Sequence, residues 1–138
     1  MKTIVAKALA GDAQPIRMVA DQVSSPTPAT ALAAALQQMA IDLSEGRHLP
    51  PLLHFAGQPP VSWFDFTAAI LAALSRCSAA ALPDLVPLRL ADLPRAATRP
   101  HFSALDCGLA RQFGYPPPEW RSALDNLVAS LTKKRIAA

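Results

Sequence analysis

Apolar residues recur along this chain with the period of a helix in about five segments. The first predicted helix begins at the very first residues, with Ile4, Val5 and Ala8 on one face, and Gly11-Asp12 ends it. For the second, Thr27 is the predicted N-cap and Pro28 takes the first helical position. We expect the large apolar residues of this second helix to face a core up to Gly46: Leu32, Leu36, Met39 and Leu43.

Capping signals predict where the later helices begin. Ser62 with Asp65, and Ser103 with Asp106, have the spacing of a capping box, and Gly114 would end the helix that Ser103 starts. A run of three prolines precedes the last apolar helical pattern. The predicted helices are 63–76, 103–113 and 119–133.

Three short segments read as strands: 16–20, 52–56 and 86–90. The middle one, Leu52 to Ala56, is apolar without alternation and bounded by prolines, which is typical of a strand buried on both faces of a parallel sheet. Such a strand needs neighbours that three short strands hardly supply. We therefore predict a helix-rich α/β fold that is a piece of a larger α/β protein.

Composition favours one domain over residues 1–138, because 51% of the residues are apolar. The apolar runs fall far short of the ~20 residues that span a bilayer, and Lys7 interrupts the N-terminal one, so neither a membrane helix nor a secretory signal is expected. We expect a cytoplasmic protein.

Charge and cysteines argue against two further classes. The net charge of +3 is accounted for by Lys133, Lys134 and Arg135 at the end of the last predicted helix, where cations complement the helix dipole, so no nucleic-acid partner is expected. Cys77 and Cys107 have no neighbouring ligands at zinc spacing, so neither a disulfide framework nor a metal site is implied.

Two polar segments are candidates for ligand recognition. Asp21 to Ala29 follows the first predicted strand and leads into a helix, which is where ligand loops commonly lie. The second segment, Arg99 to Asp106, carries a guanidinium group whose geometry suits phosphate oxygens.

These segments, and the order of the motifs between and after them, resemble the C-terminal part of the dTDP-4-dehydrorhamnose reductases, which are extended short-chain dehydrogenase/reductases. The resemblance covers essentially the whole chain, and its strength lies in the order and spacing of landmarks that are individually weak. The matching residues are Asp21-Gln22, Pro26-Thr27, His54-Phe55, Ser62-Trp63-Phe64, Arg99-Pro100, Ser103, Leu105-Asp106 and Pro118-Glu119-Trp120-Arg121.

The resemblance implies a nucleotide-sugar-binding role, because the family reduces dTDP-4-dehydro-L-rhamnose to dTDP-L-rhamnose with NADPH. The substrate-binding positions that it indicates are Gln22, Pro26, Thr27, Arg99 and Ser103. Two residues depart from the family pattern: Ser24 replaces the usual Gly and Phe102 replaces the usual Asn.

The cofactor-binding and catalytic parts of that family have no counterpart in this sequence. There is no Gly-x-Gly-x-x-Gly, and Tyr115, the one tyrosine, has no lysine four residues later. We therefore expect no cofactor in this chain and no catalysis by this chain alone, with NADPH implied only for the complete family enzyme. Trp63 and Trp120 begin predicted helices and are interpreted as core residues.

Three functions remain open at this point. The first is the substrate-binding portion of a sugar-nucleotide reductase, which implies a separate Rossmann-domain polypeptide or self-association. The second is a stand-alone binding or scaffolding module that pairs with another protein through the edge of the 52–56 strand. The third is a helical interaction domain unrelated to sugars, which predicts that the Arg99 segment does not converge with Gln22.

Overall fold

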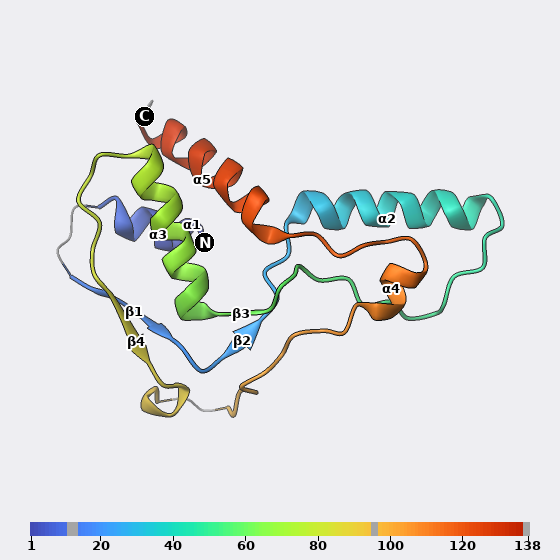
Figure 1. Ribbon diagram of the computed structural model, residues 1–138, viewed down its shortest axis with the longest axis horizontal. Helices are drawn as coiled ribbons and strands as arrows, with labels where there is room; N and C mark the ends of the chain where they lie inside the picture. The colour runs from blue at the N-terminus through green and yellow to red at the C-terminus, as the bar shows by residue number, and fades with distance from the viewer. Residues whose placement is uncertain (11–13, 95–96, 137–138) are drawn as a thin grey trace.

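The computed structural model describes residues 1–10, 14–94 and 97–136, with side chains up to residue 133 (Figure 1). The predicted helix stop at Gly11-Asp12 and the side chains of Lys134 and Arg135 lie outside this described part. The elements in chain order are α1 Lys2–Ala8, β1 Ile16–Val19, β2 Val23–Ser24, α2 Ala29–Ser44, β3 Val61–Ser62, α3 Trp63–Cys77, β4 Leu85–Leu88, the 3-10 turn η1 Leu90–Asp92, α4 Gly108–Gln112 and α5 Trp120–Ile136.

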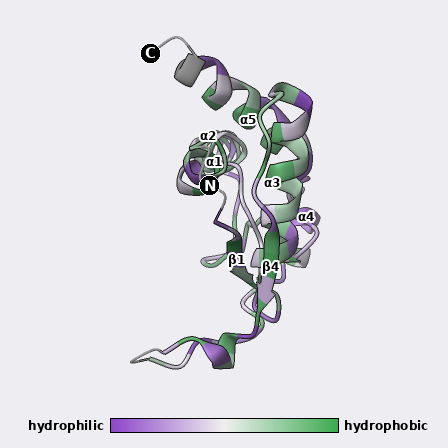
Figure 2. Ribbon diagram, turned by 90° about the vertical axis from the view of Figure 1, so that its left-hand side faces the viewer, coloured by the Kyte–Doolittle hydropathy of each residue, from purple (hydrophilic) through white to green (hydrophobic). Residues whose placement is uncertain are grey.

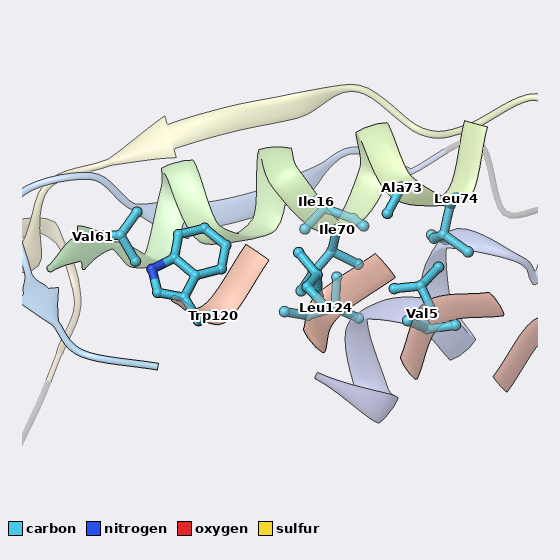
Figure 3. Packing of buried hydrophobic residues seen from close by; sticks show 11 residues of the cluster. Val5, Ile16, Val61, Ile70, Ala73, Leu74, Trp120 and Leu124 are labelled. Carbon is cyan, nitrogen blue, oxygen red and sulfur yellow. The ribbon is translucent and has the colours of Figure 1, made fainter. Parts of the chain in front are cut away.

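Helix α3 forms the centre of the hydrophobic core. Its start is fixed as the sequence predicts, because the Ser62 side chain accepts a hydrogen bond from the Asp65 backbone N–H at 3.0 Å. Ile70 and Leu74 on its inner face are both 0% exposed. Figure 3 shows these side chains among residues from α1, β1 and α5, and the buried cluster consists of Ile4, Val5, Ala8, Ile16, Val61, Ile70, Ala73, Leu74, Trp120, Leu124 and Val128.

The described strands form two small two-stranded sheets. β1 and β4 pair in parallel, with Ile16 opposite Leu85, and Figure 2 shows them side by side at the edge of the helical layer. β2 and β3, which the sequence patterns do not predict, pair antiparallel with Val23 opposite Ser62. The result is a helix-rich α/β fold with five α-helices in the described part, as the sequence predicts.

The predicted strand Leu52 to Ala56 is not a strand in the structure. The backbone of residues 48–55 forms no hydrogen bond to any described residue, and the Leu52 side chain is 67% exposed. β1 and β4 pair only with each other in the described part, so no sheet extends to this segment. The apolar pattern of residues 52–56 is therefore present without the strand neighbours that it would need.

Helix α2 has the predicted extent, but its apolar stripe is not buried. Leu36 and Leu43 are 56% and 57% exposed, and Figure 1 shows α2 extending away from the α1, α3 and α5 cluster. Its N-cap position is taken by Pro28 with no side-chain cap, so the predicted cap at Thr27 is wrong.

A cluster around Asp42, the buried residue of α2, attaches the far end of this helix to α4. The carboxylate accepts hydrogen bonds from the Tyr115 hydroxyl at 2.5 Å, from Gln38 at 2.8 Å and from Arg47 at 2.6 Å. Arg47 also donates to the Phe113 carbonyl at 2.7 Å. We call Gln38, Asp42, Arg47 and Tyr115 the Asp42 clasp.

Two residues of this clasp, Arg47 and Tyr115, directly follow glycines that end helices. Gly46 and Gly114 have φ angles of 83° and 91°, which a glycine adopts without steric cost. After each glycine the chain closes a Schellman motif, in which the N–H of Arg47 bonds to the Asp42 carbonyl and that of Tyr115 bonds to the Ala110 carbonyl. The end of α4 at Gly114 is thus as predicted, whereas its start is Gly108, not Ser103.

The clasp perturbs the ionisation of both of its acidic groups. Hydrogen bonds from Tyr115 and then from Gln38 lower the pKa of Asp42, because they stabilise the charged form. Burial, and next the hydrogen bond to Asp42, raises the pKa of Tyr115.

Among the described residues, no helix combines the length and the apolar content that crossing a bilayer requires.

We expect the substitution Tyr115→Phe to lower the thermal unfolding temperature most near neutral pH. A lowered Asp42 pKa contributes stability above the unfolded pKa of about 4, which is lost as the pH falls through the folded pKa. A raised Tyr115 pKa contributes stability below about pH 10, which is lost as the pH rises through the folded pKa. Thermal melts from acid to alkaline pH should therefore show the difference between wild type and variant shrinking at both extremes.

The matched control is Ser44→Ala, which removes a hydroxyl whose hydrogen bond goes to the Ile41 carbonyl, a group that does not ionise. Its effect should be independent of pH. An unchanged unfolding temperature in Tyr115→Phe at neutral pH would contradict the role given to the clasp.

Candidate functional site

The two polar segments singled out in the sequence meet at strand β2. The Val23 N–H donates to the His101 carbonyl at 2.7 Å, and the Val23 carbonyl accepts from the Ser103 N–H at 2.9 Å. Val23 and Phe102 thereby form a parallel β-bridge, and the Ser103 hydroxyl adds a bond to the same Val23 carbonyl at 3.2 Å. This convergence contradicts the expectation from the third function, an interaction domain in which these segments stay apart.

Side chains at the ends of β2 reinforce the contact. Asp21 accepts a hydrogen bond from the Leu90 N–H at 2.7 Å, and His101 Nδ1 lies 3.0 Å from the Asp21 carbonyl and 3.7 Å from its carboxylate. The buried Gln22 contributes its backbone carbonyl, which accepts from the Trp63 N–H at 3.3 Å. The loops on either side of β2 are thus held by hydrogen bonds to three distant parts of the chain.

Arg99 lies two residues before this bridge, on an exposed stretch. Its side chain makes no hydrogen bond or ion pair with the described part of the chain. The guanidinium group therefore has its donors available to an anion, as the prediction for this residue requires. Ser103, in contrast, uses its hydroxyl to hold the bridge.

Thr27 locks the turn between β2 and α2. Its hydroxyl donates to the Ser25 carbonyl at 3.1 Å and accepts from the Gly57 N–H at 3.1 Å. Gly57 is required here, since a Cβ on it would lie 1.9 Å from the Pro26 carbonyl oxygen. The close approach of residues 26 and 57 fixes the shape of the predicted ligand loop.

A hollow of about 480 Å³ opens beside this turn. Its walls come from β2 and the following turn, from the start of α3 and from α5, and none of its lining residues carries a charged side chain. Pro26 and Thr27 line it, whereas Gln22, Arg99 and Ser103 do not. Sequence reasoning thus identified two residues of the hollow and three that lie outside its walls.

One wall of the hollow is aromatic. Phe66 packs edge-on against Trp63, with ring centroids 6.4 Å apart, and against Trp120, with centroids 5.3 Å apart. Trp120 is core as interpreted, being 2% exposed with its indole N–H donated to the Pro59 carbonyl at 2.9 Å. Trp63 is 40% exposed and lines the hollow, so its interpretation as a core residue is wrong.

The sequence did not predict that Trp63 and Phe66 line a hollow, because their spacing in α3 is that of an ordinary buried stripe. The position of Trp63 in the helix distinguishes it from a buried residue: it is the first residue of α3, beside the loop that Gln22 anchors.

Within residues 1–10, 14–94 and 97–136 no three potential metal ligands gather.

The fold and the convergent loops define the class first: this is a helix-rich α/β domain in which two polar segments meet beside a hollow lined by residues without charged side chains. A family model described as the RmlD substrate binding domain matches residues 1–133, and the chain therefore belongs to that family.

Relatives and solved structures agree with this assignment. The dTDP-4-dehydrorhamnose reductase of Aggregatibacter actinomycetemcomitans is 36% identical over 115 residues, which are 81% of this chain and 39% of the relative. That of Mycolicibacterium smegmatis is 36% identical over 124 residues, which are 88% of this chain and 35% of the relative.

A crystal structure of dTDP-4-dehydrorhamnose reductase from Yersinia enterocolitica is similar with a TM-score of 0.74 at 25% identity, covering 94% of this chain and 42% of that one. The Bacillus anthracis reductase in complex with NADP gives a TM-score of 0.66 at 26% identity, covering 91% of this chain and 41% of that one. The chain thus spans about two-fifths of the length of these relatives.

We expect Gly57→Ala to destabilise the protein by roughly 1–3 kcal/mol, because the new methyl group would overlap a backbone carbonyl that cannot swing aside. Urea unfolding measures the change. Gly108→Ala is the matched control, since there the nearest atom to the new Cβ, at 3.1 Å, belongs to the movable Asp106 side chain. Equal stability of the two variants would show that the approach of residues 26 and 57 is not tight.

Proposed function

We propose that this chain is the nucleotide-sugar-binding portion of an NADPH-dependent dTDP-4-dehydrorhamnose reductase of dTDP-rhamnose biosynthesis, acting as a single domain over residues 1–138. The observation that carries the proposal is the pair of backbone hydrogen bonds between Val23 and residues 101 and 103, which bring the Arg99 segment close to the turn that lines the hollow. A nucleotide sugar offers what such an arrangement suits: a diphosphate for an arginine, and neutral rings for an uncharged recess.

In this proposal Arg99 binds the diphosphate of the ligand. Its donors are unused by the described residues, and a guanidinium group bonds phosphate oxygens in a bidentate fashion. Gln22 and Ser103 position the ligand loops and do not bind the ligand directly, because the Gln22 carbonyl and the Ser103 hydroxyl hold the loops together. Pro26 and Thr27 form the polar edge of the hollow.

The reduction itself belongs to other residues of the complete reductase. Hydride transfer requires a bound NADPH and a proton donor beside the sugar carbonyl. The Tyr115 hydroxyl is bonded to Asp42 in a buried cluster, and its pKa is raised by burial, so it does not serve as that donor. We therefore propose that the chain binds nucleotide sugar and that a Rossmann-domain polypeptide supplies the coenzyme.

We expect calorimetric titration of the purified chain to detect dTDP-L-rhamnose and dTDP at millimolar ligand. Arg99→Ala should weaken binding roughly tenfold or more, because a hydrogen bond to a charged group is worth about 1.5–3 kcal/mol. Arg17→Ala is the matched control, since it removes an equal charge from the exposed side of β1. Absence of heat with both ligands, or equal loss in both variants, would contradict the proposal.

A second candidate, pairing with another protein, is favoured by the surface formed by α2 and the 48–55 segment. Leu36, Leu43 and Leu52 are more than half exposed, and the backbone of residues 48–55 has free hydrogen-bonding groups within the described part. Exposed apolar side chains beside an unpaired backbone suit the addition of a strand and a packed helix from a second chain.

Sedimentation velocity tests this pairing on the purified chain. We expect concentration-dependent association of the wild type at micromolar concentrations and a monomer for the double variant Leu36→Gln with Leu43→Gln, because glutamine removes the apolar contact without adding charge. The control double variant, Leu105→Gln with Leu109→Gln, changes two exposed leucines that lie before and within α4, outside α2 and the 48–55 segment, and should associate like the wild type. A wild-type monomer at all concentrations would exclude self-association.

A further inference from the structure

A second hollow, of about 340 Å³, lies between the loop before β3 and the segment that leads into α4. None of its lining residues lines the first hollow, and Arg99 is not among them. Its lining combines Phe102 with the polar side chains of Gln58, Asp106 and Arg111. The nucleotide-sugar function proposed above uses none of these four side chains.

Both walls of this second hollow are fixed by contacts with other parts of the chain. On one side, the Gln58 N–H donates to the Pro118 carbonyl at 2.8 Å. On the other side, Phe102 forms a backbone β-bridge to β2, and the sulfur of the buried Cys107 lies 3.8 Å from the Ala56 carbonyl oxygen. Because its walls are already held in place, a ligand that enters this hollow does not have to order the protein first.

Phe102 supplies an exposed aromatic face to the second hollow. The residue is 64% exposed, although the residues on either side of it are bonded to Val23 at 2.7 and 2.9 Å. A phenyl ring so exposed contributes little to the core, and the face of an aromatic ring carries partial negative charge that attracts polarised C–H bonds. Phe102 stands where the reductase family usually has Asn, so this aromatic face is a feature of this chain and not of the family.

The polar side chains beside this ring have unused hydrogen-bonding capacity. Those of Gln58 and Arg111 form no hydrogen bond or ion pair with the described part of the chain. Asp106 uses only Oδ1, which accepts from the Gly108 N–H at 2.8 Å. A guanidinium group donates, a carboxylate accepts and an amide does both. One carboxylate and one guanidinium group balance, so the lining as a whole is neutral.

This combination of groups selects among classes of ligand. An anion would be attracted by Arg111 but repelled by the Asp106 carboxylate. A neutral sugar ring fits both, because each hydroxyl group donates and accepts, and one face of the ring presents C–H bonds to an aromatic surface. The volume of about 340 Å³ lies at the lower end of the range for ligand pockets, which suits a single ring.

We propose that the second hollow is a binding site for a neutral monosaccharide in its pyranose form. The C–H face of the sugar stacks on Phe102, and its hydroxyl groups bond to the side chains of Gln58, Asp106 and Arg111. The inference goes beyond the nucleotide-sugar function, because this site takes the sugar without a nucleotide and at residues that the first hollow does not share.

Two-dimensional ¹H–¹⁵N spectra of the full chain test this site through the Gly108 amide, which is bonded to Asp106. The probes are methyl α-L-rhamnopyranoside, methyl α-D-mannopyranoside and methyl α-D-glucopyranoside, which are neutral and locked in the pyranose form. At least one of them should shift the Gly108 signal in a saturable way at millimolar concentration, while the signal of Gly46, at the end of α2, stays in place. No shift with any pyranoside, whether or not inorganic phosphate or thymidine gives one, would overturn the proposal.

Variants of Phe102 separate stacking from general damage to the site. Phe102→Asn, which restores the residue usual in the family, should weaken pyranoside binding roughly 3- to 10-fold, whereas Phe102→Tyr keeps the ring and should bind like the wild type. Both variants should keep the wild-type unfolding temperature, because the side chain is exposed and the bridge to β2 is made by the backbone. Leu109→Ala, which changes an exposed apolar residue of α4 outside the hollow, is the matched control. Equal affinity of Phe102→Asn and wild type would also overturn the proposal.

Addition of dTDP separates this site from the nucleotide-sugar function. With dTDP at saturation the pyranoside should still shift the Gly108 signal, because the two hollows share no lining residue. Displacement of the pyranoside by dTDP would overturn the separate site and leave the nucleotide-sugar function intact. Failure of dTDP to bind would contradict that function and leave the sugar site standing, since the pyranoside titration is read without any nucleotide.

Discussion

The hydrogen bonds around Val23 are the constraint on which the arrangement of this site depends. A strand of only two residues pairs with β3 on one side and with the Phe102 segment on the other. So short a strand contributes little burial of its own, and its value lies in connecting segments that are about forty and eighty residues away along the chain. Without this connection the Arg99 segment and the turn at Pro26 would be unrelated loops.

The Asp42 clasp holds α2 in place, although the apolar side chains of this helix pack against little of the core. Large exposed leucines give α2 no firm attachment along its length, so its position is fixed at the two ends. Thr27 and Gly57 fix the turn at its beginning, and the carboxylate of Asp42, with Arg47 and Tyr115, fixes its end to α4. Polar contacts at the ends thus replace a continuous apolar interface.

The sequence predicted those features whose cause is local. The Ser62 cap, the glycine at the end of α4 and the α3 stripe depend on neighbours a few residues away, and they are found as expected. The strand at residues 52–56 and the buried stripe of α2 fail because burial is a tertiary property that no local pattern guarantees. The exposure of Trp63 was not predicted for the converse reason, since the hollow that it lines is formed together with α5 and the turn after β2.

The distribution of charge across the site follows from the same architecture. Arg99 lies on an exposed segment next to the Val23 bridge, where a guanidinium group stays hydrated. The hollow, bordered by α3, α5 and the turn, has no charged side chain in its lining, because part of its wall is the outer face of residues that also build the core. Phe66 and Trp120 belong to both, so the packing that stabilises the fold also sets the shape of the recess. The recess and the guanidinium group of Arg99 are thus two separate surfaces, one shaped by the packing of the core and the other held by the Val23 bridge.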